Sequence, residues 1–437
     1  MSRWPPSNVS MSPSPAEIRA AAVSSGLHPL LQQLFTAWHR ESLAWCVLRM
    51  PDNTFAPDSD IDLLIDSANL AAAAAIAESQ RFVRLPGKHR GLHLITYHSH
   101  TGTWLWLHCV TELRFGPHEA LRGDAASTLL QRRLPNSLPR LSPGDEFWVT
   151  LAHCLLDRHK VVEKHRRRLA ILAGQASGDG VIAHRLEGLL PLGVTREELL
   201  HACQFEDWDA LERLIPGLVE AASQSSRPNV PRRATQLAKR VFSGIKETRL
   251  RRGLSVALLG PDGAGKSTLA AGIESTFVFP VRQVYMGLTG GMLRHVDRLR
   301  VPGVVRLGRL VVIWGRYLLA KYHISRGRLV VFDRYIYDAE VPTPYPLSLA
   351  NRLGRWIDGR CCPAPDLILL LDAPGDVMHQ RKPSYTPEMI ENWRQHFLRL
   401  RQRFPQMEVI DTTQPADVVR AQATDLVWRQ YVRRWER

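Results

Sequence analysis

The feature that most constrains this chain is a glycine-rich stretch between an apolar run and a helix-forming run. Residues 260–267 read GPDGAGKS, which fits the pattern GxxxxGK[ST]. The apolar run LSVALL precedes this stretch, and the following STLAAGIEST can form a helix. Glycines let backbone N–H groups converge on phosphate oxygens, and a helix N-terminus adds partial positive charge. Strand, loop and helix in this order predict a phosphate-binding loop, or P-loop.

The P-loop pattern gives individual residues chemical roles. Lys266 would reach the β- and γ-phosphates of ATP as a point charge, and Ser267 would ligate Mg²⁺. A P-loop alone does not separate a kinase from an ATPase or a GTPase, so residues further along the chain must decide. The residues expected to bind ATP are Gly260, Asp262, Gly263, Ala264, Gly265, Lys266, Ser267 and Thr268.

Two charged segments follow the P-loop. RLVVFDRY predicts a strand that ends in Asp333 and is followed by Arg334. The carboxylate can hold a metal or the attacking oxygen, and the guanidinium can clamp a second phosphate with two hydrogen bonds. Further on, Arg381 and Lys382 precede a proline-containing loop and a helix. This pattern suits a mobile basic lid, with an exposed polar turn as the alternative interpretation.

Residues 255 to about 420 resemble the thymidylate kinases, or more broadly the thymidylate-kinase-like P-loop kinases. Four features match in order: GPDGAGKST, the strand ending in FDRY, PDLILLLDAP and the basic lid. The resemblance implies an α/β domain with a five-stranded parallel sheet and nucleoside monophosphate kinase activity with ATP and Mg²⁺. It assigns catalysis to Lys266, Asp333, Arg334 and Arg381, the metal to Ser267 and Asp333, and the phosphorylated acceptor to Asp262, Arg334 and Lys382.

Two parts of this resemblance leave alternatives open. Asp262 could contact the acceptor, or it could cap amides of its own loop. Between Gly287 and Arg328 the sequence is rich in arginine, and no pocket for a thymine base can be assigned. Trp314, Tyr317 and Tyr322 could stack on a base, but their helical spacing favours a place in the core. The acceptor therefore stays open between thymidylate and another phosphorylated compound.

The positive charge of the chain is concentrated in the half that contains the P-loop. Residues 1–225 carry 22 basic and 24 acidic side chains, whereas the rest carries 35 and 18. Such a surface attracts polyanions. The second hypothesis is therefore a nucleotide-gated regulatory ATPase that holds nucleic acid or a phosphorylated glycan. No DNA- or RNA-binding motif accompanies the charge, so the kinase hypothesis is preferred.

The residues before the P-loop predict further domains. Residues 27–142 contain four apolar runs typical of strands and one helical stretch, so they indicate a small α+β domain. Residues 143–225 have helical spacing, with Ser142 and Pro143 as a helix start. We expect a disordered tail over residues 1–26, a basic linker over 226–252 and the P-loop domain over 253–437.

One segment of the α+β domain, APDSDIDLLID, resembles the strand of nucleotidyltransferases that carries a DxD pair. Asp60 and Asp62 would point from the same face of the strand, as shared metal ligands require. The family's Gly-Ser turn is replaced around Arg49, and His108 and Cys109 stand where a third carboxylate is expected. We interpret the domain as degenerate and non-catalytic, with active nucleotidyl transfer or a fortuitous match as alternatives.

The cysteines and the apolar runs indicate in which cellular compartment the protein works. The six cysteines lack the CxxC spacing of zinc sites, and no run of about 18 apolar residues occurs. These patterns predict reduced thiols in a cytoplasmic protein without a membrane span.

Overall fold

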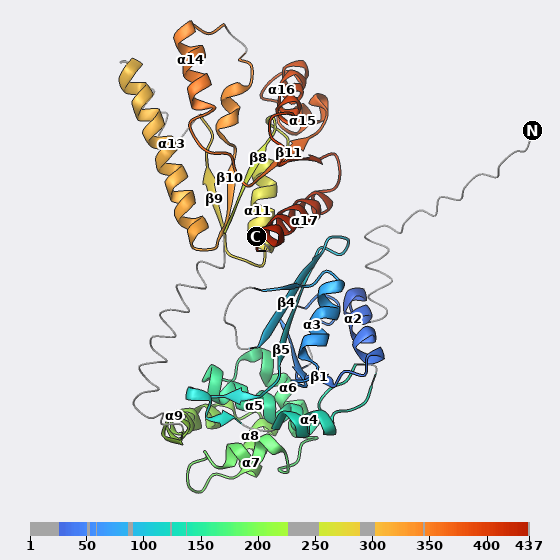
Figure 1. The fold of residues 1–437 in the computed structure, drawn as a ribbon. Coiled ribbons are helices and arrows are strands. Elements are labelled where there is room, and N and C mark those ends of the chain that lie inside the picture. Colours follow the sequence, from blue (N-terminus) through green and yellow to red (C-terminus); the bar gives the residue numbers. More distant parts are fainter. Residues whose placement is uncertain are drawn as a thin grey trace, which may run out of the picture. The chain divides into compact units, whose positions relative to one another are not determined.

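The structure, a computed structural model, describes residues 26–49, 53–57, 59–85, 91–122, 125–136, 138–225, 253–288, 302–343 and 346–435. The chain divides into two compact units (Figure 1), one built mostly from described residues up to 225 and the other mostly from residues 253–435. We call them the first unit and the P-loop unit. The tail predicted up to residue 25 and the linker predicted over 226–252 lie outside the described residues.

The first unit begins with a sheet whose strand order is β1-β2-β5-β4-β3. The four predicted strands and the predicted helix are present, whereas α2 was not predicted. Pro29 opens α2, and the His28 side chain accepts a hydrogen bond from the Leu30 amide at its start. The elements are α2 (Pro29–Arg40), β1 (Trp45–Val47), β2 (Ile61–Ile65), α3 (Leu70–Ser79), β3 (Val83–Arg84), β4 (Leu92–His98), β5 (Thr103–Val110), β6 (Arg114–Phe115), η1 (Pro117–Glu119), β7 (Leu121–Arg122) and α4 (Ala125–Arg132).

Helices make up the rest of the first unit. The predicted start of α5 is confirmed, because the Ser142 hydroxyl accepts a hydrogen bond from the Asp145 amide. Phe147 of α5 shares one hydrophobic core with Cys46 and Leu64 of the sheet, so the two predicted front domains are packed together. The elements are α5 (Pro143–Ala152), the π-helical η2 (His153–Arg158), α6 (Glu163–Ala173), α7 (Val181–Glu187), α8 (Arg196–Gln204) and α9 (Trp208–Ser225).

The P-loop unit contains a five-stranded parallel sheet in the order β12-β11-β8-β10-β9. The three inner strands, β8, β10 and β11, are nearly continuous apolar runs, as expected for strands buried on both faces, whereas the edge strands β9 and β12 also carry exposed residues. The strands are β8 (Leu254–Leu259), β9 (Val281–Tyr285), β10 (Leu329–Asp333), β11 (Leu367–Asp372) and β12 (Met407–Asp411). The helices are α11 (Lys266–Thr276), α13 (Pro302–Ser325), η3 (Ile336–Glu340), α14 (Leu349–Asp358), α15 (Gly375–Arg381), α16 (Pro387–Leu400) and α17 (Ala416–Trp435).

The strand order decides where a ligand can bind. The chain leaves β8 toward β10 and β9 on one side and later fills the other side with β11 and β12. The carboxyl end of β8 is thus the point at which the strand order reverses, where parallel sheets form their ligand crevices. The P-loop follows β8 directly, so the fold places it at this crevice.

Helices cover both faces of the parallel sheet (Figure 1). Helix α13 packs on β8, β9 and β10, and Ile313 and Tyr317 of α13 share a core with Val330 of β10 and Phe397 of α16. Helices α11 and α17 pack against each other and the sheet. None of the described helices is long and apolar enough to span a bilayer.

Candidate active site

The P-loop is tightly bent and leaves little room for side chains. Gly260, Gly263 and Gly265 have φ angles of 138°, 85° and 94°, in the region that favours glycine. A Cβ atom on Gly260 would lie 2.6 Å from the Leu371 carbonyl oxygen, and one on Gly263 would lie 2.2 Å from that of Met378. At Gly265 a Cβ would meet open space, so only the backbone conformation favours glycine there.

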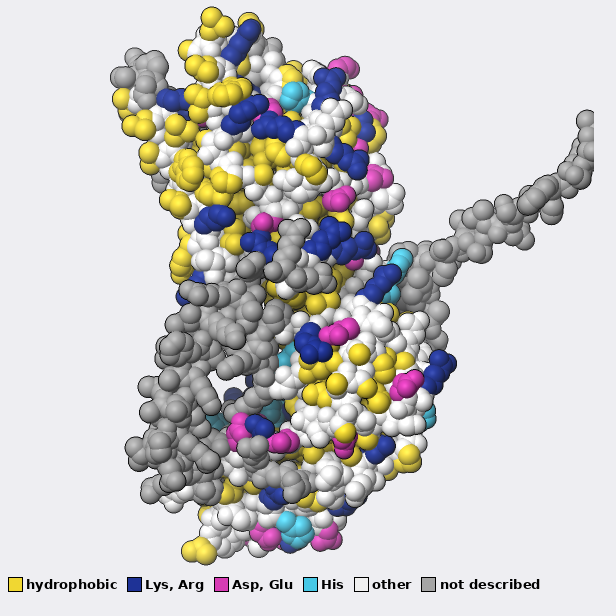
Figure 2. Space-filling view, in the orientation of Figure 1, with side chains coloured by type: hydrophobic (Ala, Val, Ile, Leu, Met, Phe, Trp, Pro, Cys, Tyr) yellow, Lys and Arg dark blue, Asp and Glu magenta, His cyan; other side chains and the backbone are white. Residues whose placement is uncertain are grey.

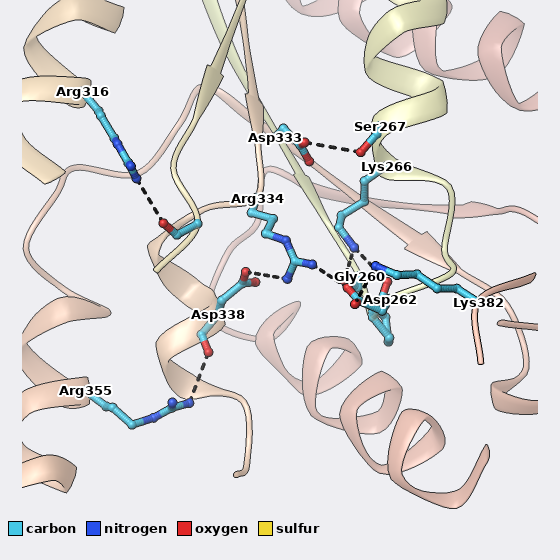
Figure 3. A network of polar contacts seen from close by, with 12 residues as sticks. Gly260, Asp262, Lys266, Ser267, Arg316, Asp333, Arg334, Asp338, Arg355 and Lys382 are labelled. Carbon is cyan, nitrogen blue, oxygen red and sulfur yellow. Dashed lines mark hydrogen bonds and ion pairs between the residues drawn. The ribbon is translucent and has the colours of Figure 1, made fainter. Parts of the chain in front are cut away.

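Lys266, the first residue of α11, lies across the mouth of the loop. Its side chain is 7% exposed, and its ammonium donates hydrogen bonds of 2.8 Å to the carbonyls of Gly260 and Pro261 (Figure 3). Burial, together with the nearby Arg334 charge, lowers the pKa of Lys266 to about 8. The ammonium is therefore held at the centre of the loop, with a pKa well below the ordinary value of lysine.

A hydroxyl and a carboxylate that could hold a cation lie together beside the P-loop. The Ser267 hydroxyl lies 3.4 Å from a carboxylate oxygen of Asp333, to which it donates (Figure 3). Parallel pairing of β10 with β8 brings Asp333, the last residue of its strand, to the edge that carries the loop. A hydroxyl and a carboxylate fit Mg²⁺, which takes few protein ligands and keeps several waters. Neighbouring Thr268 is exposed, and Ala264 is fully buried beneath the loop.

Asp262 connects the P-loop to the two basic segments that the sequence singled out. Its carboxylate accepts hydrogen bonds from Arg334, at 2.5 Å, and from the Lys382 ammonium, at 3.0 Å (Figure 3). Burial raises the pKa of Asp262, but Lys382 and Arg334 outweigh it and hold the pKa below its ordinary value. An ionised Asp262 between two cations explains the acidic residue inside the loop better than local capping does.

Arg334 has a backbone conformation that is unusual for its residue type. Its φ is 65°, in the left-handed region. A guanidinium nitrogen of Arg334 also lies 3.4 Å from the Asp338 carboxylate, with which it forms an ion pair (Figure 3). Non-glycine residues stay in this region only where their surroundings fix them, and such positions cluster at functional sites.

The hydrogen bond of Arg381 is made away from the cluster of Asp262, Arg334 and Lys382. Its guanidinium donates a 2.8 Å hydrogen bond to the carbonyl of Thr412, just after β12. Adjacent Lys382 points instead to Asp262, because α15 ends between them. The predicted basic lid thus reaches the P-loop through Lys382, and the catalytic role of Arg381 stays a prediction.

A cavity of about 1000 Å³ adjoins Asp262 and Arg334. Arginines line part of its wall, and the aromatic rings of Tyr385, Trp393 and Phe397 line another part. Arg355, which sequence reasoning did not select, donates a 2.6 Å hydrogen bond to the Val341 carbonyl at this wall.

The arginine-rich stretch between Gly287 and Arg328 supplies two of the cavity arginines. Arg306 and Arg309 lie 3.5 and 3.6 Å from the Asp358 carboxylate, which is 2% exposed. Asp358 was not predicted, since nothing near α14 in the sequence signals a partner in α13. Of the described part of this stretch, for which no pocket could be assigned, Leu288, Val305, Arg306 and Arg309 line the cavity.

The aromatic residues of α13 differ in part from expectation. Only Tyr317 is buried in the core, whereas Trp314 and Tyr322 are 42% and 53% exposed. The core interpretation, which their spacing favoured over base stacking, therefore holds for Tyr317 but not for Trp314 and Tyr322. Helical spacing shows that residues share a face but does not show whether that face meets the protein or solvent.

The first unit holds a second cluster, around Asp62. Parallel pairing of β2 and β5 sets Asp62 opposite His108, whose Nδ1 lies 2.8 Å from the carboxylate. Arg49 forms an ion pair with the same carboxylate. Burial raises the pKa of Asp62, but His108 and Arg49 outweigh it and lower the pKa to about 2.

This cluster has one arrangement that could hold a metal. Ligand atoms of Asp60, Asp62 and His108 lie within 4.8 Å of one another. Two carboxylates and one imidazole would suit Mn²⁺ or Zn²⁺ as well as Mg²⁺. His108 occupies the place where nucleotidyltransferases are expected to have a third carboxylate, and the domain's relation to that family remains a prediction.

Comparisons with known proteins relate part of the chain to thymidylate kinases. The chain is 24% identical over 212 residues to a probable thymidylate kinase of Thermococcus onnurineus (strain NA1), across 41% of this chain and 99% of that protein. It is 24% identical over 205 residues to a probable thymidylate kinase of Thermococcus kodakarensis, across 39% and 96%. These similarities support a thymidylate kinase-like domain.

The remaining comparisons add little to that similarity. The structure of thymidylate kinase from Candida albicans matches 41% of this chain and 94% of its own, with 17% identity and a TM-score of 0.35. No protein-family model matches the chain.

Proposed function

We propose that this chain is an ATP-dependent kinase that transfers the γ-phosphoryl group to a small phosphorylated acceptor. A nucleoside monophosphate such as thymidylate is the first candidate, in line with the low-identity similarity to probable thymidylate kinases. The observation that carries the proposal is the cluster of Asp262, Arg334 and Lys382 between the P-loop and a cavity of about 1000 Å³. A plain ATPase has no need of a second, acceptor-sized site beside its P-loop.

The donor side would be formed by the P-loop. The Lys266 ammonium would bind the phosphates of ATP. It would then no longer donate hydrogen bonds to the carbonyls of Gly260 and Pro261. Ser267 and Asp333 would hold Mg²⁺, which when bound would neutralise charge on the transferred group. Backbone N–H groups at the start of α11 would surround the phosphate oxygens. Phosphoryl transfer needs positioning and charge neutralisation, and these groups provide both.

The acceptor side would be formed by Arg334 and its neighbours. The Arg334 guanidinium can offer two parallel N–H donors to an acceptor phosphate, while Asp338 and Asp262 orient it. The cavity volume is at the upper end for small-molecule sites, so a phosphorylated nucleoside or sugar fits within it. Lys382, one residue after α15, could close over the transferred group.

The test is ATP consumption by the full chain with a panel of acceptors, including nucleoside monophosphates and sugar phosphates. We expect ADP formation to depend on one acceptor class and to yield a phosphorylated product. ADP formation without acceptor, stimulated by nucleic acid or a polyanionic glycan, would instead support a nucleotide-gated ATPase. Lys266→Ala serves as the control that assigns the activity to the P-loop.

A further inference from the structure

Two cysteines stand next to each other shortly after α14, and we call them the dithiol. Cys361 is partly exposed, and its thiol donates a 3.1 Å hydrogen bond to the carbonyl of Asp358, the last residue of the helix. Cys362 is 7% exposed, and its thiol donates a hydrogen bond to the sulfur of Cys361. Both thiols are free, and because they are in contact they can react with each other.

The dithiol differs from the other cysteines of the chain in its reactivity. Hydrogen bonding with Cys362 holds the pKa of Cys361 below its ordinary value, although burial opposes this shift. Since the thiolate is the reactive form, oxidation should begin at Cys361. The other four cysteines are each at most 1% exposed, and burial raises the pKa of their thiols to about 12; they are Cys46, Cys109, Cys154 and Cys203.

Two adjacent cysteines can form only a strained disulfide. The Cα atoms of neighbouring residues lie about 3.8 Å apart across a trans peptide bond, whereas disulfides usually join Cα atoms about 4.4 to 6.8 Å apart. Closing the bond therefore distorts the backbone between Cys361 and Cys362. Strained disulfides are more easily reduced than others, and they are the reversible, regulatory ones.

We propose that the dithiol is an oxidation site at which hydrogen peroxide converts Cys361 and Cys362 into a reversible disulfide. The Cys361 thiolate attacks one peroxide oxygen, so that an S–O bond forms, the O–O bond breaks and hydroxide leaves. The Cys362 sulfur then displaces a second hydroxide from the Cys361 sulfenic acid and forms the S–S bond. The protons of the two thiols convert both hydroxides to water, so one peroxide accepts two electrons.

The dithiol lies between two parts of the proposed acceptor site. Before it in the chain, Asp358 lines the cavity and forms ion pairs with two arginines of α13. After it, the carbonyl of Pro363 accepts a 2.5 Å hydrogen bond from the hydroxyl of buried Tyr335, the residue that follows Arg334. A distortion of the dithiol backbone therefore acts on the cavity wall and on the neighbour of Arg334.

Helix α14 is free to follow such a distortion. Its residues Leu349, Leu353 and Trp356 are 82%, 60% and 56% exposed, and Figure 2 shows hydrophobic side chains at the surface over this part of the P-loop unit. A helix with few buried apolar contacts moves at a low cost in free energy. We therefore expect oxidation to shift Asp358 and to weaken acceptor binding. This effect on the acceptor rests on the proposed function, whereas the thiol chemistry does not.

The first test follows the thiols of the full chain by mass spectrometry. The reduced protein is treated with equimolar hydrogen peroxide, and the remaining thiols are alkylated after denaturation. We expect Cys361 and Cys362 to lose two hydrogens together and to resist alkylation until a reductant is added. Cys362→Ser should stop at a Cys361 sulfenic acid, which dimedone traps. The control Cys203→Ala removes a fully buried thiol and should oxidise like wild type.

The second test compares the kinetics of the reduced and oxidised chains. Oxidation should raise the KM for the acceptor at least about tenfold with little change in the KM for ATP, and a reductant should reverse the effect. Cys361→Ser/Cys362→Ser should not respond to peroxide. A disulfide that leaves the KM unchanged would overturn the link to the cavity.

The thiol chemistry and the proposed function can fail separately. The dithiol proposal would be overturned if Cys361 stays reduced, if the disulfide joins two chains, or if the buried cysteines oxidise as fast. A chain that forms the disulfide within one molecule but phosphorylates no acceptor would confirm the oxidation site and refute the kinase.

Discussion

The two units each build a site around an aspartate that is paired with an arginine, yet the two sites differ in what surrounds the pair. In the P-loop unit, Asp262 meets Arg334 and Lys382 beside a bent glycine loop and a large cavity. In the first unit, Asp62 meets Arg49 and His108, and the two partners take up both of its carboxylate oxygens.

The comparison shows that an aspartate–arginine pair indicates a reactive site only when further groups beside it can bind a ligand. The Asp62 cluster satisfies its own charges, which lowers the pKa of Asp62 to about 2 and leaves only Asp60 exposed. The P-loop cluster also contains groups that could bind a ligand: backbone N–H donors, the Lys266 ammonium, and Ser267 with Asp333. We therefore expect chemistry in the P-loop unit and none at Asp62.

The largest effect should follow from Lys266→Ala. The substitution removes the ammonium at the centre of the loop, so phosphoryl transfer should fall at least about 100-fold, or roughly 3 kcal/mol in the transition state. Steady-state kinetics with the best acceptor measures this loss. Circular dichroism should show unchanged helix content, and turnover near the wild-type level would remove the P-loop from the mechanism.

Arg334→Lys tests the acceptor side with a smaller change. Lysine keeps the charge but loses the two-pronged donor geometry, so the KM for the acceptor should rise about 10- to 100-fold while the KM for ATP changes little. Arg352→Lys on α14 is a control, since Arg352 is exposed and is not part of the cavity lining. Equal changes in both KM values would mean that Arg334 does not clamp the acceptor.

The pH profile depends on Lys266. Its pKa is lowered to about 8, so the ammonium is fully present below that pH and is lost as pH rises through it. In the free enzyme kcat/KM for ATP should therefore fall about tenfold between pH 7 and pH 9. Lys266→Arg, whose side chain stays charged, should remove this alkaline decline from whatever activity remains. A wild-type profile that is flat to pH 10 would contradict the assignment.

The smallest effect should come from the first unit. Asp60→Asn/Asp62→Asn should leave kinase activity of the full chain within about twofold of wild type, because the P-loop site uses neither residue. Wild type should transfer no nucleotide from labelled triphosphates with Mg²⁺ or Mn²⁺. If wild type transfers nucleotides and the double variant does not, the protein is bifunctional. The Asp62 cluster would then be a catalytic site, as the P-loop cluster is proposed to be.

Much of the P-loop unit could be predicted from local sequence. The inner strands β8, β10 and β11 are nearly continuous apolar runs, and the P-loop residues are adjacent in the chain, so both patterns are visible without tertiary contacts. The pairing of Asp62 with His108 was only partly visible, as a histidine at the expected position on a later strand. Asp338 stands only four residues after Arg334 in DRYIYD, but no helix contains both residues, so the sequence pattern did not indicate their contact.

The sequence alone determined the chemistry that the P-loop can offer, because glycine conformations, one lysine and one serine are specified over nine consecutive residues. Tertiary structure alone decided which distant charges join them. It brought Lys382 to Asp262 across 120 residues, turned Arg381 to Thr412, and set Arg306 and Arg309 against buried Asp358. It also left one apolar face of α13 exposed, because periodicity records which residues share a face whereas only packing determines what that face meets.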